Sequence, residues 1–144
     1  ILESDRKIDT IAKQDEKALR IMKLEGIGPI TATAMIASVG DIREFQNGRQ
    51  FAAWLGLVPR QWSSGGKNRL GRITKRGDVY LRTLLVHGAR AVIRFAENKE
   101  DRKSLWIKDV KARRGFNKAA VALAAKHARI VWSMLINNTE YRVA

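Results

Sequence analysis

Two adjacent serines, Ser63 and Ser64, lie in a glycine-rich segment from Pro59 to Asp78 that also holds six basic side chains. Those cations are Arg60, Lys67, Arg69, Arg72, Lys75 and Arg76. A hydroxyl among them could attack a phosphodiester, because cations stabilise the negative charge that develops on the phosphoryl oxygens. Such an attack needs a base or metal to accept the proton, and neither is evident nearby. Composition alone therefore favours a phosphate-binding loop whose serines donate hydrogen bonds.

A second motif runs from Leu24 to Ala32 and contains a Gly-hydrophobic-Gly turn between two predicted helices. In a helix-hairpin-helix, such a turn exposes backbone N–H groups that bind a DNA phosphate without reading sequence. We therefore predict phosphate contacts at Gly26, Gly28 and Thr31. The alternative is an ordinary tight turn between helices, with Ile27 tucked into the core.

The net charge of +14 makes nucleic acid the default partner. The excess is uneven along the chain. Residues 1–50 hold 8 basic and 8 acidic residues, residues 51–94 hold 9 and 1, and residues 95–144 hold 11 and 5. A stretch with so few acids repels itself unless a polyanion is near, so we expect DNA to bind around the middle segment. An incidentally basic surface is the alternative.

Several other classes of site are excluded or disfavoured by composition. There is no cysteine, so disulfides and thiolate metal sites are impossible, and two histidines make a structural zinc site improbable. No membrane-spanning segment is expected, because Lys126 and Arg129 interrupt one apolar run and arginines interrupt the other. We expect no metal in this chain, and the lack of cysteine suits a cytoplasmic location.

Helical periodicity and turn signals define the elements that would position these motifs. An amphipathic helix is predicted from Asp5 to Lys23, or alternatively the tail of an upstream coiled coil. The next helix is predicted from Ile30 to Val39, with Pro29 at its start. From Arg60 to Gly77 no helical period is found, which indicates a long structured loop or a short hairpin around Arg69–Thr74.

The remaining predicted helices begin at capping residues. Asn47 can cap a helix that ends before Gly56, Asp78 can cap a long one, and Asn117 can cap the last, with Val121 on its buried face. A short helix from Ser104 to Arg114 should close at Gly115. We expect a mostly α, compact domain, with residues 1–23 as a leading helix and residues 24–144 as the main domain.

Other conspicuous side chains have structural interpretations. His87 and His127 lie beside apolar residues in predicted helices, and each is interpreted as a partly buried, hydrogen-bonded histidine rather than a base. Three tryptophans, Trp54, Trp106 and Trp132, are predicted to be core residues. Trp62 lies beside the serines, where it could stack on an exposed base.

Five ordered blocks resemble one protein family. They are Gly-Ile-Gly-Pro-Ile-Thr-Ala at 26–32, Phe-Ala-Ala-Trp-Leu-Gly-Leu-Val-Pro-Arg at 51–60, Ser-Ser-Gly-Gly-Lys at 63–67, Gly-Arg-Ile-Thr-Lys-Arg-Gly-Asp at 71–78, and Leu-Arg-Thr-Leu-Leu-Val-His-Gly-Ala-Arg at 81–90. Together they resemble the C-terminal domain of the bridge-RNA-guided insertion-sequence transposases, relatives of the pilin-gene invertases. The resemblance runs from about Leu19 to the end of the last predicted helix.

The resemblance implies a catalytic role for a serine. In that family an N-terminal RuvC-like domain supplies four acidic metal ligands, a coiled coil follows, and the C-terminal domain contributes a serine that becomes linked to DNA. The family's serine-glycine pair falls on Ser64-Gly65, while Ser63 stays open as the alternative. Mg²⁺ would be bound by the acidic domain, from another protomer, and a structured guide RNA and a homo-oligomer are implied as partners.

The sequence therefore predicts a DNA-binding, serine-contributing domain of a transposase or recombinase. A noncatalytic helix-hairpin-helix module that binds nucleic acid is the main alternative, and a basic ribosome-associated structural protein is a more remote one. The chain opens with Ile1, which suggests a piece of a longer polypeptide. Catalysis is therefore expected of the full-length transposase rather than of such a piece alone.

Overall fold

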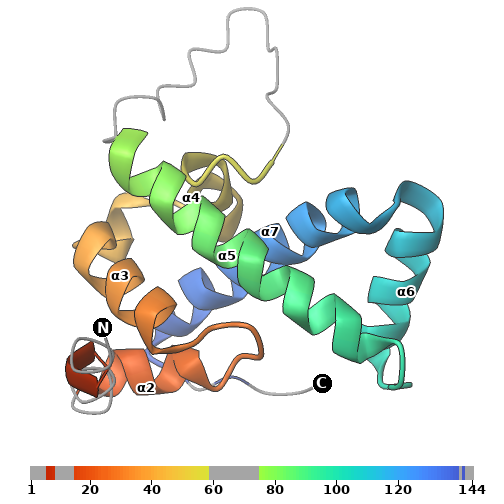
Figure 1. The fold of residues 1–144 in the computed structure, drawn as a ribbon. Coiled ribbons are helices and arrows are strands. Elements are labelled where there is room, and N and C mark those ends of the chain that lie inside the picture. Colours follow the sequence, from red (N-terminus) through yellow and green to blue (C-terminus); the bar gives the residue numbers. More distant parts are fainter. Residues whose placement is uncertain (1–5, 9–14, 59–74, 140, 142–144) are drawn as a thin grey trace, which may run out of the picture.

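The computed structural model describes residues 6–8, 15–58, 75–139 and 141, with only the backbone described at residues 75–78. Every regular element among these residues is helical, which confirms the mostly α fold class (Figure 1). The elements are α2 (Glu16–Met22), α3 (Pro29–Val39), the 3-10 helix η1 (Ile42–Glu44), α4 (Gly48–Trp54), α5 (Lys75–Ala96), α6 (Arg102–Arg114) and α7 (Phe116–Asn137). The hairpin considered at Arg69–Thr74 lies outside the described residues.

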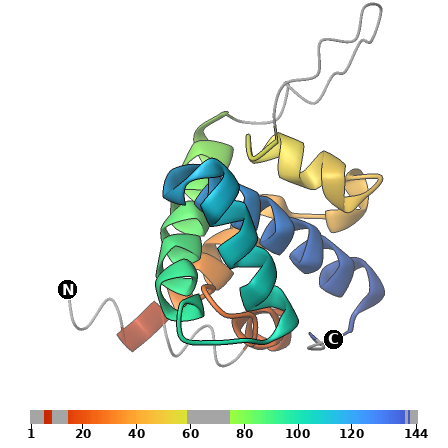
Figure 2. The same ribbon diagram turned by 90° about the vertical axis from the view of Figure 1, so that its right-hand side faces the viewer.

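α4, α5 and α6 pack around α7, whereas α3 packs against α2 and α5. α7 contacts α4, α5 and α6 along its length and α2 more briefly, and α5 crosses it at the centre of the molecule (Figures 1 and 2). Its buried face includes five alanines, which let neighbouring helices approach closely. Val121 was predicted on this face but is 40% exposed, because one residue turns the helix by about 100° away from buried Ala120.

α7 also passes a simple length and hydropathy test for a membrane span, with a mean hydropathy of 1.4 over its most apolar stretch. Lys126 and Arg129 therefore do not exclude this helix by hydropathy alone, while the expectation that no segment spans a membrane is not contradicted. Half of this stretch is buried inside the protein, and the core helix of a soluble protein passes the same test. The finding is weak evidence for membrane insertion.

Side-chain caps define the beginnings of several helices. The side chain of Asn47 accepts a hydrogen bond from the N–H of Gln50 at 2.8 Å, which confirms the predicted start of α4. Asp101 caps α6 in the same way. Pro29 stands in the first turn of α3, as predicted.

The predicted uninterrupted helix over Asp5–Lys23 is wrong. Asp15 has an extended backbone (φ −94°, ψ 116°), and its carboxylate accepts hydrogen bonds from two N–H groups of the following turn, so α2 starts there. Of the residues before it, 6–8 are helical. Ala18 and Ile21 of α2 belong to the same core as the later helices, so elements on both sides of the expected boundary at residue 23 pack together.

Two other predicted caps are also wrong. α5 begins at Lys75, three residues before Asp78, which therefore stands within the first turn, where the helix dipole favours an acid. α7 begins at Phe116, and Gly115 is its N-cap rather than Asn117. Gly115 ends α6 as predicted, with φ 90°, and the chain enters α7 at the next residue.

The turn between α2 and α3 packs directly against α5, because Gly26 of the turn and Gly88 of α5 approach each other closely. Gly26 has φ 93°, and a methyl group at its Cα would lie 2.9 Å from a Val92 methyl and 3.1 Å from the Gly88 carbonyl oxygen. A methyl group at Gly88 would in turn overlap the Gly26 carbonyl oxygen. Neither position can carry a larger residue without moving the turn away from α5.

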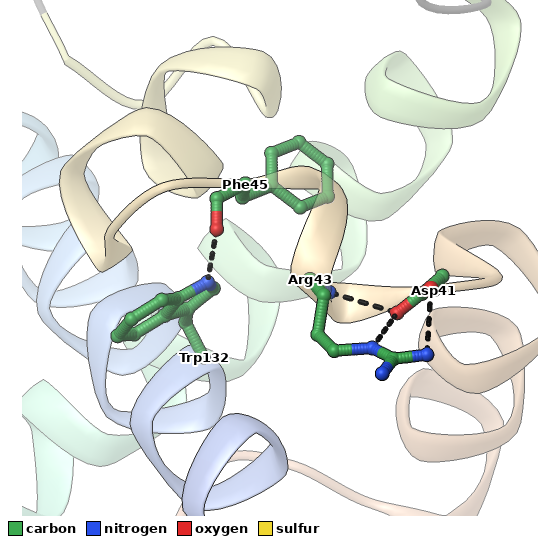
Figure 3. Close-up of polar contacts among 4 residues, drawn as sticks. All are labelled: Asp41, Arg43, Phe45 and Trp132. Carbon is green, nitrogen blue, oxygen red and sulfur yellow. Dashed lines mark hydrogen bonds and ion pairs between the residues drawn. The ribbon is translucent and has the colours of Figure 1, made fainter.

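The connection between α3 and α4 is held onto α7 by Trp132. Its indole Nε1 donates a hydrogen bond to the carbonyl oxygen of Phe45 at 3.3 Å (Figure 3). In the same connection, the Asp41 carboxylate caps η1 by accepting hydrogen bonds from the backbone N–H of Arg43 at 2.9 Å and from its guanidinium at 3.1 Å. These bonds lower the pKa of Asp41.

An aromatic cluster fills the space beneath this connection. The ring of Phe45 meets Phe51 edge-on at 5.1 Å between centroids and lies 5.2 Å from Trp54. Trp54 is therefore a core residue, as predicted. Trp106 and Trp132 are half-buried and pack against the core from outside.

The two histidines have opposite environments. His87 is exposed on α5, so the prediction that it is partly buried is wrong. His127 is buried on α7 at 1% exposure, but neither ring nitrogen has a hydrogen-bond partner, so the prediction of a satisfied histidine is also wrong. Burial first, and then the nearby cations Lys103 and Lys126, lower the pKa of His127 from 6.5 to about 3.

Replacing Gly88 by alanine should lower the free energy of unfolding by about 2 kcal/mol, because the new methyl overlaps the Gly26 carbonyl. Alanine is otherwise the better helix former by about 1 kcal/mol. Urea unfolding followed by circular dichroism measures the change. Gly28→Ala is the matched control: its methyl would meet nothing within 4 Å, and we expect a loss below about 1 kcal/mol. A Gly88→Ala variant more stable than the parent would contradict the contact.

His127 should make stability depend on pH. The unfolded chain protonates this histidine below 6.5, whereas the folded chain does so only near 3. Stability should therefore be complete above pH 6.5 and fall on acidification towards pH 3, by about 1 kcal/mol per pH unit. His127→Phe should remove this part of the dependence, and exposed His87→Gln should leave it intact. Identical pH profiles for His127→Phe and the parent would show that His127 is not buried in its neutral form.

Candidate nucleic-acid interface

Some of the residues predicted to hold a phosphodiester lie outside the described residues, and two others lie in α5. Ser63 and Ser64 lie outside the described residues, as do Trp62 and the predicted cations Arg60, Lys67, Arg69 and Arg72. Lys75 and Arg76 form the first turn of α5, so the expectation that the loop extends to Gly77 is wrong. Both are good helix formers, which lets the helix begin before Asp78.

The two helix ends that flank residues 59–74 lie at the same end of the molecule (Figures 1 and 2). Gly56, just after α4, has φ 73°, and a methyl group there would lie 2.7 Å from a guanidinium nitrogen of Arg82 on α5. Arg82 therefore lies over the C-terminal end of α4, where the helix dipole favours a cation. Its side chain links the two flanking helices and adds an exposed positive charge beside the segment that carries the serines.

The turn between α2 and α3 is built from residues with different roles. Ile27 is 3% exposed and packs into the core, and Gly26 makes the close contact with α5. Glu25 forms an ion pair with Lys99 at 3.5 Å on the far side of the turn. Gly28 has an ordinary φ of −92°, and a methyl group there would meet nothing within 4 Å, so neither backbone strain nor packing requires glycine at this position.

The first turn of α3 leaves backbone donors without partners inside the helix. Gly28 is the N-cap and has no side chain to accept from them, and the first turn contains no acid. The first intrahelical bond runs from the N–H of Ala32 to the Gly28 carbonyl at 2.9 Å. Thr31 is only 7% exposed, so a phosphate contact from this residue would use its backbone N–H rather than its hydroxyl.

Positive charge on α4 and α5 is not neutralised by acids. From Phe45 to Ala96 the sequence contains one acid, Asp78. Within the described part of the chain, Arg49, Arg82 and Arg90 take part in no ion pair. None of these three arginines was predicted to contact nucleic acid, although the near absence of acids over this stretch was the signal that could have found them.

Ion pairs gather instead at the two ends of the sequence. Asp41 pairs with Arg43 at 3.1 Å, and Lys111 pairs with Glu97 at 2.5 Å, a hydrogen bond that lowers the pKa of Glu97. Asp109 pairs with Arg113 one helical turn away. The acids of these regions are thus occupied locally. Within the described residues, Lys118, Lys126 and Arg129 of α7 also take part in no ion pair, so the unpaired positive charge of α4 and α5 continues onto α7.

A metal site does not form in the described part of the chain. No three His, Asp or Glu side chains come together there in an arrangement that could hold a metal ion. The structure therefore offers no ligand set for Mg²⁺ among these residues, and a serine activated by a metal would depend on groups located elsewhere.

The sequence is similar to transposases of insertion sequences. Residues 18–105 match the family described as "Transposase IS116/IS110/IS902 family". A probable family 20 transposase of Pseudomonas aeruginosa is 56% identical over 96% of this chain and 41% of its own length. The transposase for insertion sequence element IS1111A of Coxiella burnetii is 50% identical over 96% of this chain and 38% of its own.

A third relative extends the comparison. The transposase for insertion sequence element IS1328 of Yersinia enterocolitica is 40% identical over 98% of this chain and 42% of its own length. The chain thus spans about two fifths of the length of the curated relatives it matches. No solved structure matches it significantly. Because the family match covers more than half of its residues, the chain belongs to the transposase IS116/IS110/IS902 family.

Proposed function

We propose that this chain is the DNA-binding part of an insertion-sequence transposase and that it contributes a serine to strand cleavage and joining. The observation that carries the proposal is the uncompensated positive charge of α4 and α5, which border the serine-containing segment. A phosphodiester backbone is the polyanion that such a surface attracts, and binding to it needs no base contacts. The relatives named above are transposases, which supports DNA as the partner.

The start of α3 provides a second point of attachment. A phosphate oxygen can accept hydrogen bonds from the unpartnered N–H groups of its first turn, and the helix dipole favours the negative charge there. Glycine at position 28 is not explained by packing. It is explained if a side chain at this position would separate the phosphate from the backbone donors, as in a helix-hairpin-helix.

The serine is assigned through the family resemblance. The hydroxyl oxygen of Ser64 would attack a DNA phosphorus, forming a Ser64 Oγ–P bond while one P–O bond of the strand breaks and leaves an alcohol. The cations of residues 60–76 would stabilise the phosphoryl oxygens. The Ser64 proton must pass to an acceptor, and the described residues offer neither a base beside this segment nor a metal-ligand cluster.

The complete transposase must supply the base or the metal ligands that the described residues lack. We expect the acidic, Mg²⁺-binding domain that the resemblance implies to lie outside this chain and to come from another protomer of a homo-oligomer. A structured guide RNA is the second expected nucleic-acid partner. Residues 1–144 would then bind and position DNA in the cytoplasm, and cleavage would require the complete assembly.

Substitution of Gly28 tests the phosphate contact. Gly28→Asp and Gly28→Asn both supply a good N-cap, so both should keep or slightly raise stability. Only aspartate adds a negative charge where the phosphate would bind, so it should weaken binding of duplex DNA by roughly fivefold, about 1 kcal/mol, relative to asparagine. Fluorescence anisotropy at low salt measures both affinities. Equal affinities of the two variants would show that the turn is only structural.

Substitution of the serines tests the catalytic assignment in the full-length transposase, supplied with Mg²⁺ and its guide RNA. Ser64→Ala should lower strand cleavage by at least about a thousandfold, because it removes the nucleophile. DNA affinity should change by no more than about twofold, since one neutral hydroxyl adds little beside many cations. Ser63→Ala is the matched control, and we expect a milder effect on cleavage.

Mass spectrometry of a stalled reaction locates the covalent link. A nucleotide adduct is expected on the peptide from Trp62 to Lys67, at Ser64. An adduct on Ser63 would transfer the role to the neighbouring hydroxyl. Normal cleavage by both alanine variants, with DNA binding retained, would instead establish the noncatalytic nucleic-acid-binding module.

A further inference from the structure

The outward side of α5 exposes aromatic rings that the fold does not use. Tyr80 is 53% exposed and Phe95 is 68% exposed, and His87 between them is also exposed. Tyr80, His87 and Arg94 are spaced by seven residues, which places them in one row along the helix, and Phe95 lies beside the end of that row. Burying a phenylalanine ring is worth about 1.5–3 kcal/mol, so a ring this exposed forgoes most of that stabilisation.

Among the described helices, only the start of α7 contacts this side of α5, where Phe116 meets Arg94. The opposite side, with Leu81, Leu85 and Ala89, packs into the core. Figure 1 shows α5 running across the front of the molecule with α7 behind it, and Figure 2 shows α5 at the left-hand side of the helices. The rings are therefore available to a ligand from outside.

The charge on this side indicates what that ligand is. No acid occurs between Val79 and Ala96, whereas three arginines do. Arg90 follows His87 by three residues and thus adjoins the row of exposed side chains. Arg90 is half-buried, its Nε is buried without a hydrogen-bond partner, and it forms no ion pair with another described residue. The Arg94 guanidinium lies 5.6 Å from the centroid of the Phe116 ring on α7, a contact that orients it and leaves its charge uncompensated. A protein partner would match such a face only with a patch of acids, whereas every nucleotide brings a phosphate and a base ring.

We propose that this face, formed by Tyr80, His87, Arg90, Arg94 and Phe95 and called here the α5 outer face, binds an unpaired nucleic-acid strand. The rings stack on successive bases and the arginines contact phosphates, the combination by which proteins hold single strands. A duplex cannot use the rings, because its bases already stack on one another. The inference rests on the proposed function, in that the chain acts on nucleic acid, and adds that one bound strand is unpaired.

The position of the face relative to the other elements fits a strand that has been opened. Its first residues follow the start of α5, which adjoins the segment with the serines. His87 at its middle precedes Gly88, the residue that contacts the turn between α2 and α3. The distance from Tyr80 to Phe95 is about 22 Å at 1.5 Å per residue. At 3.4 Å per stacked base, this length accommodates about six nucleotides.

Binding of short oligonucleotides to the 144-residue chain tests the proposal. The probes are an oligothymidylate of about 12 nucleotides, roughly twice the length of the face, its ribonucleotide counterpart, an abasic strand of equal length, and a duplex. The parent should prefer the strands with bases to the abasic strand. The double variant Tyr80→Ala/Phe95→Ala should lose at least about tenfold in affinity for them, since each stacked base is worth about 1–3 kcal/mol. Its affinity for the duplex and for the abasic strand should stay within about twofold, because its arginines are intact.

Two further variants separate loss of stacking from loss of structure. Tyr80→Phe/Phe95→Tyr keeps both rings and should bind like the parent. Leu105→Ala removes another exposed apolar side chain, 52% exposed on α6, and should have no effect on any probe. Thermal unfolding of the alanine double variant should match the parent, because both rings lie outside the core.

The outcomes distinguish this inference from the proposed function. Equal affinities of the parent and the alanine double variant for the unpaired strands, with duplex binding intact, would overturn the α5 outer face and leave the DNA-binding role standing. Failure of the parent to bind any probe would overturn both. A parent that self-associates through these rings, with dissociation in the alanine double variant and no change in strand affinity, would make the face a contact between copies of the chain.

Discussion

The contact between Gly26 and Gly88 is the constraint on which the arrangement of the basic surface depends. It brings the backbone of one helical turn directly against the backbone of α5, closer than any side chain would allow. The turn between α2 and α3 and the long helix α5 are thereby held together as neighbours. As a result, the open N-terminus of α3 and the exposed side of α5 belong to one surface rather than to two separate parts of the molecule.

One part of this fold forms the stabilising core, and other parts carry positive charge without acidic partners. α7 supplies more buried residues than any other described helix, and its alanines and unpartnered His127 form a core that depends on exclusion of water rather than on polar bonds. Ion pairs are placed around the periphery, where each contributes little. α4 and α5 carry arginines without acidic partners, an arrangement that costs free energy through repulsion and is offset only when a polyanion binds.

Several features were readable from local chemistry. Pro29, Asn47 and Gly115 act within one turn of the chain, so their effects on helix ends could be predicted from spacing alone. Cap predictions failed where two signals competed: Gly115 ends one helix and starts the next, which leaves Asn117 inside α7. The break at Asp15 was missed because the apolar spacing continues across it, although its carboxylate caps a new helix.

The sequence by itself determined the helical class, the excess of positive charge in the middle and at the end of the chain, and the resemblance to one transposase family, because these depend on composition, local spacing and ordered motifs. Tertiary structure alone decided which residues are available to a ligand. His87 and His127 have similar local sequence environments, yet one is exposed and the other is buried without a partner. Likewise Gly26 and Gly28 look alike in the motif, but only Gly26 meets another backbone. Exposure and close contact arise from helices that are distant in sequence, and periodicity within one helix contains no information about which neighbour covers which side.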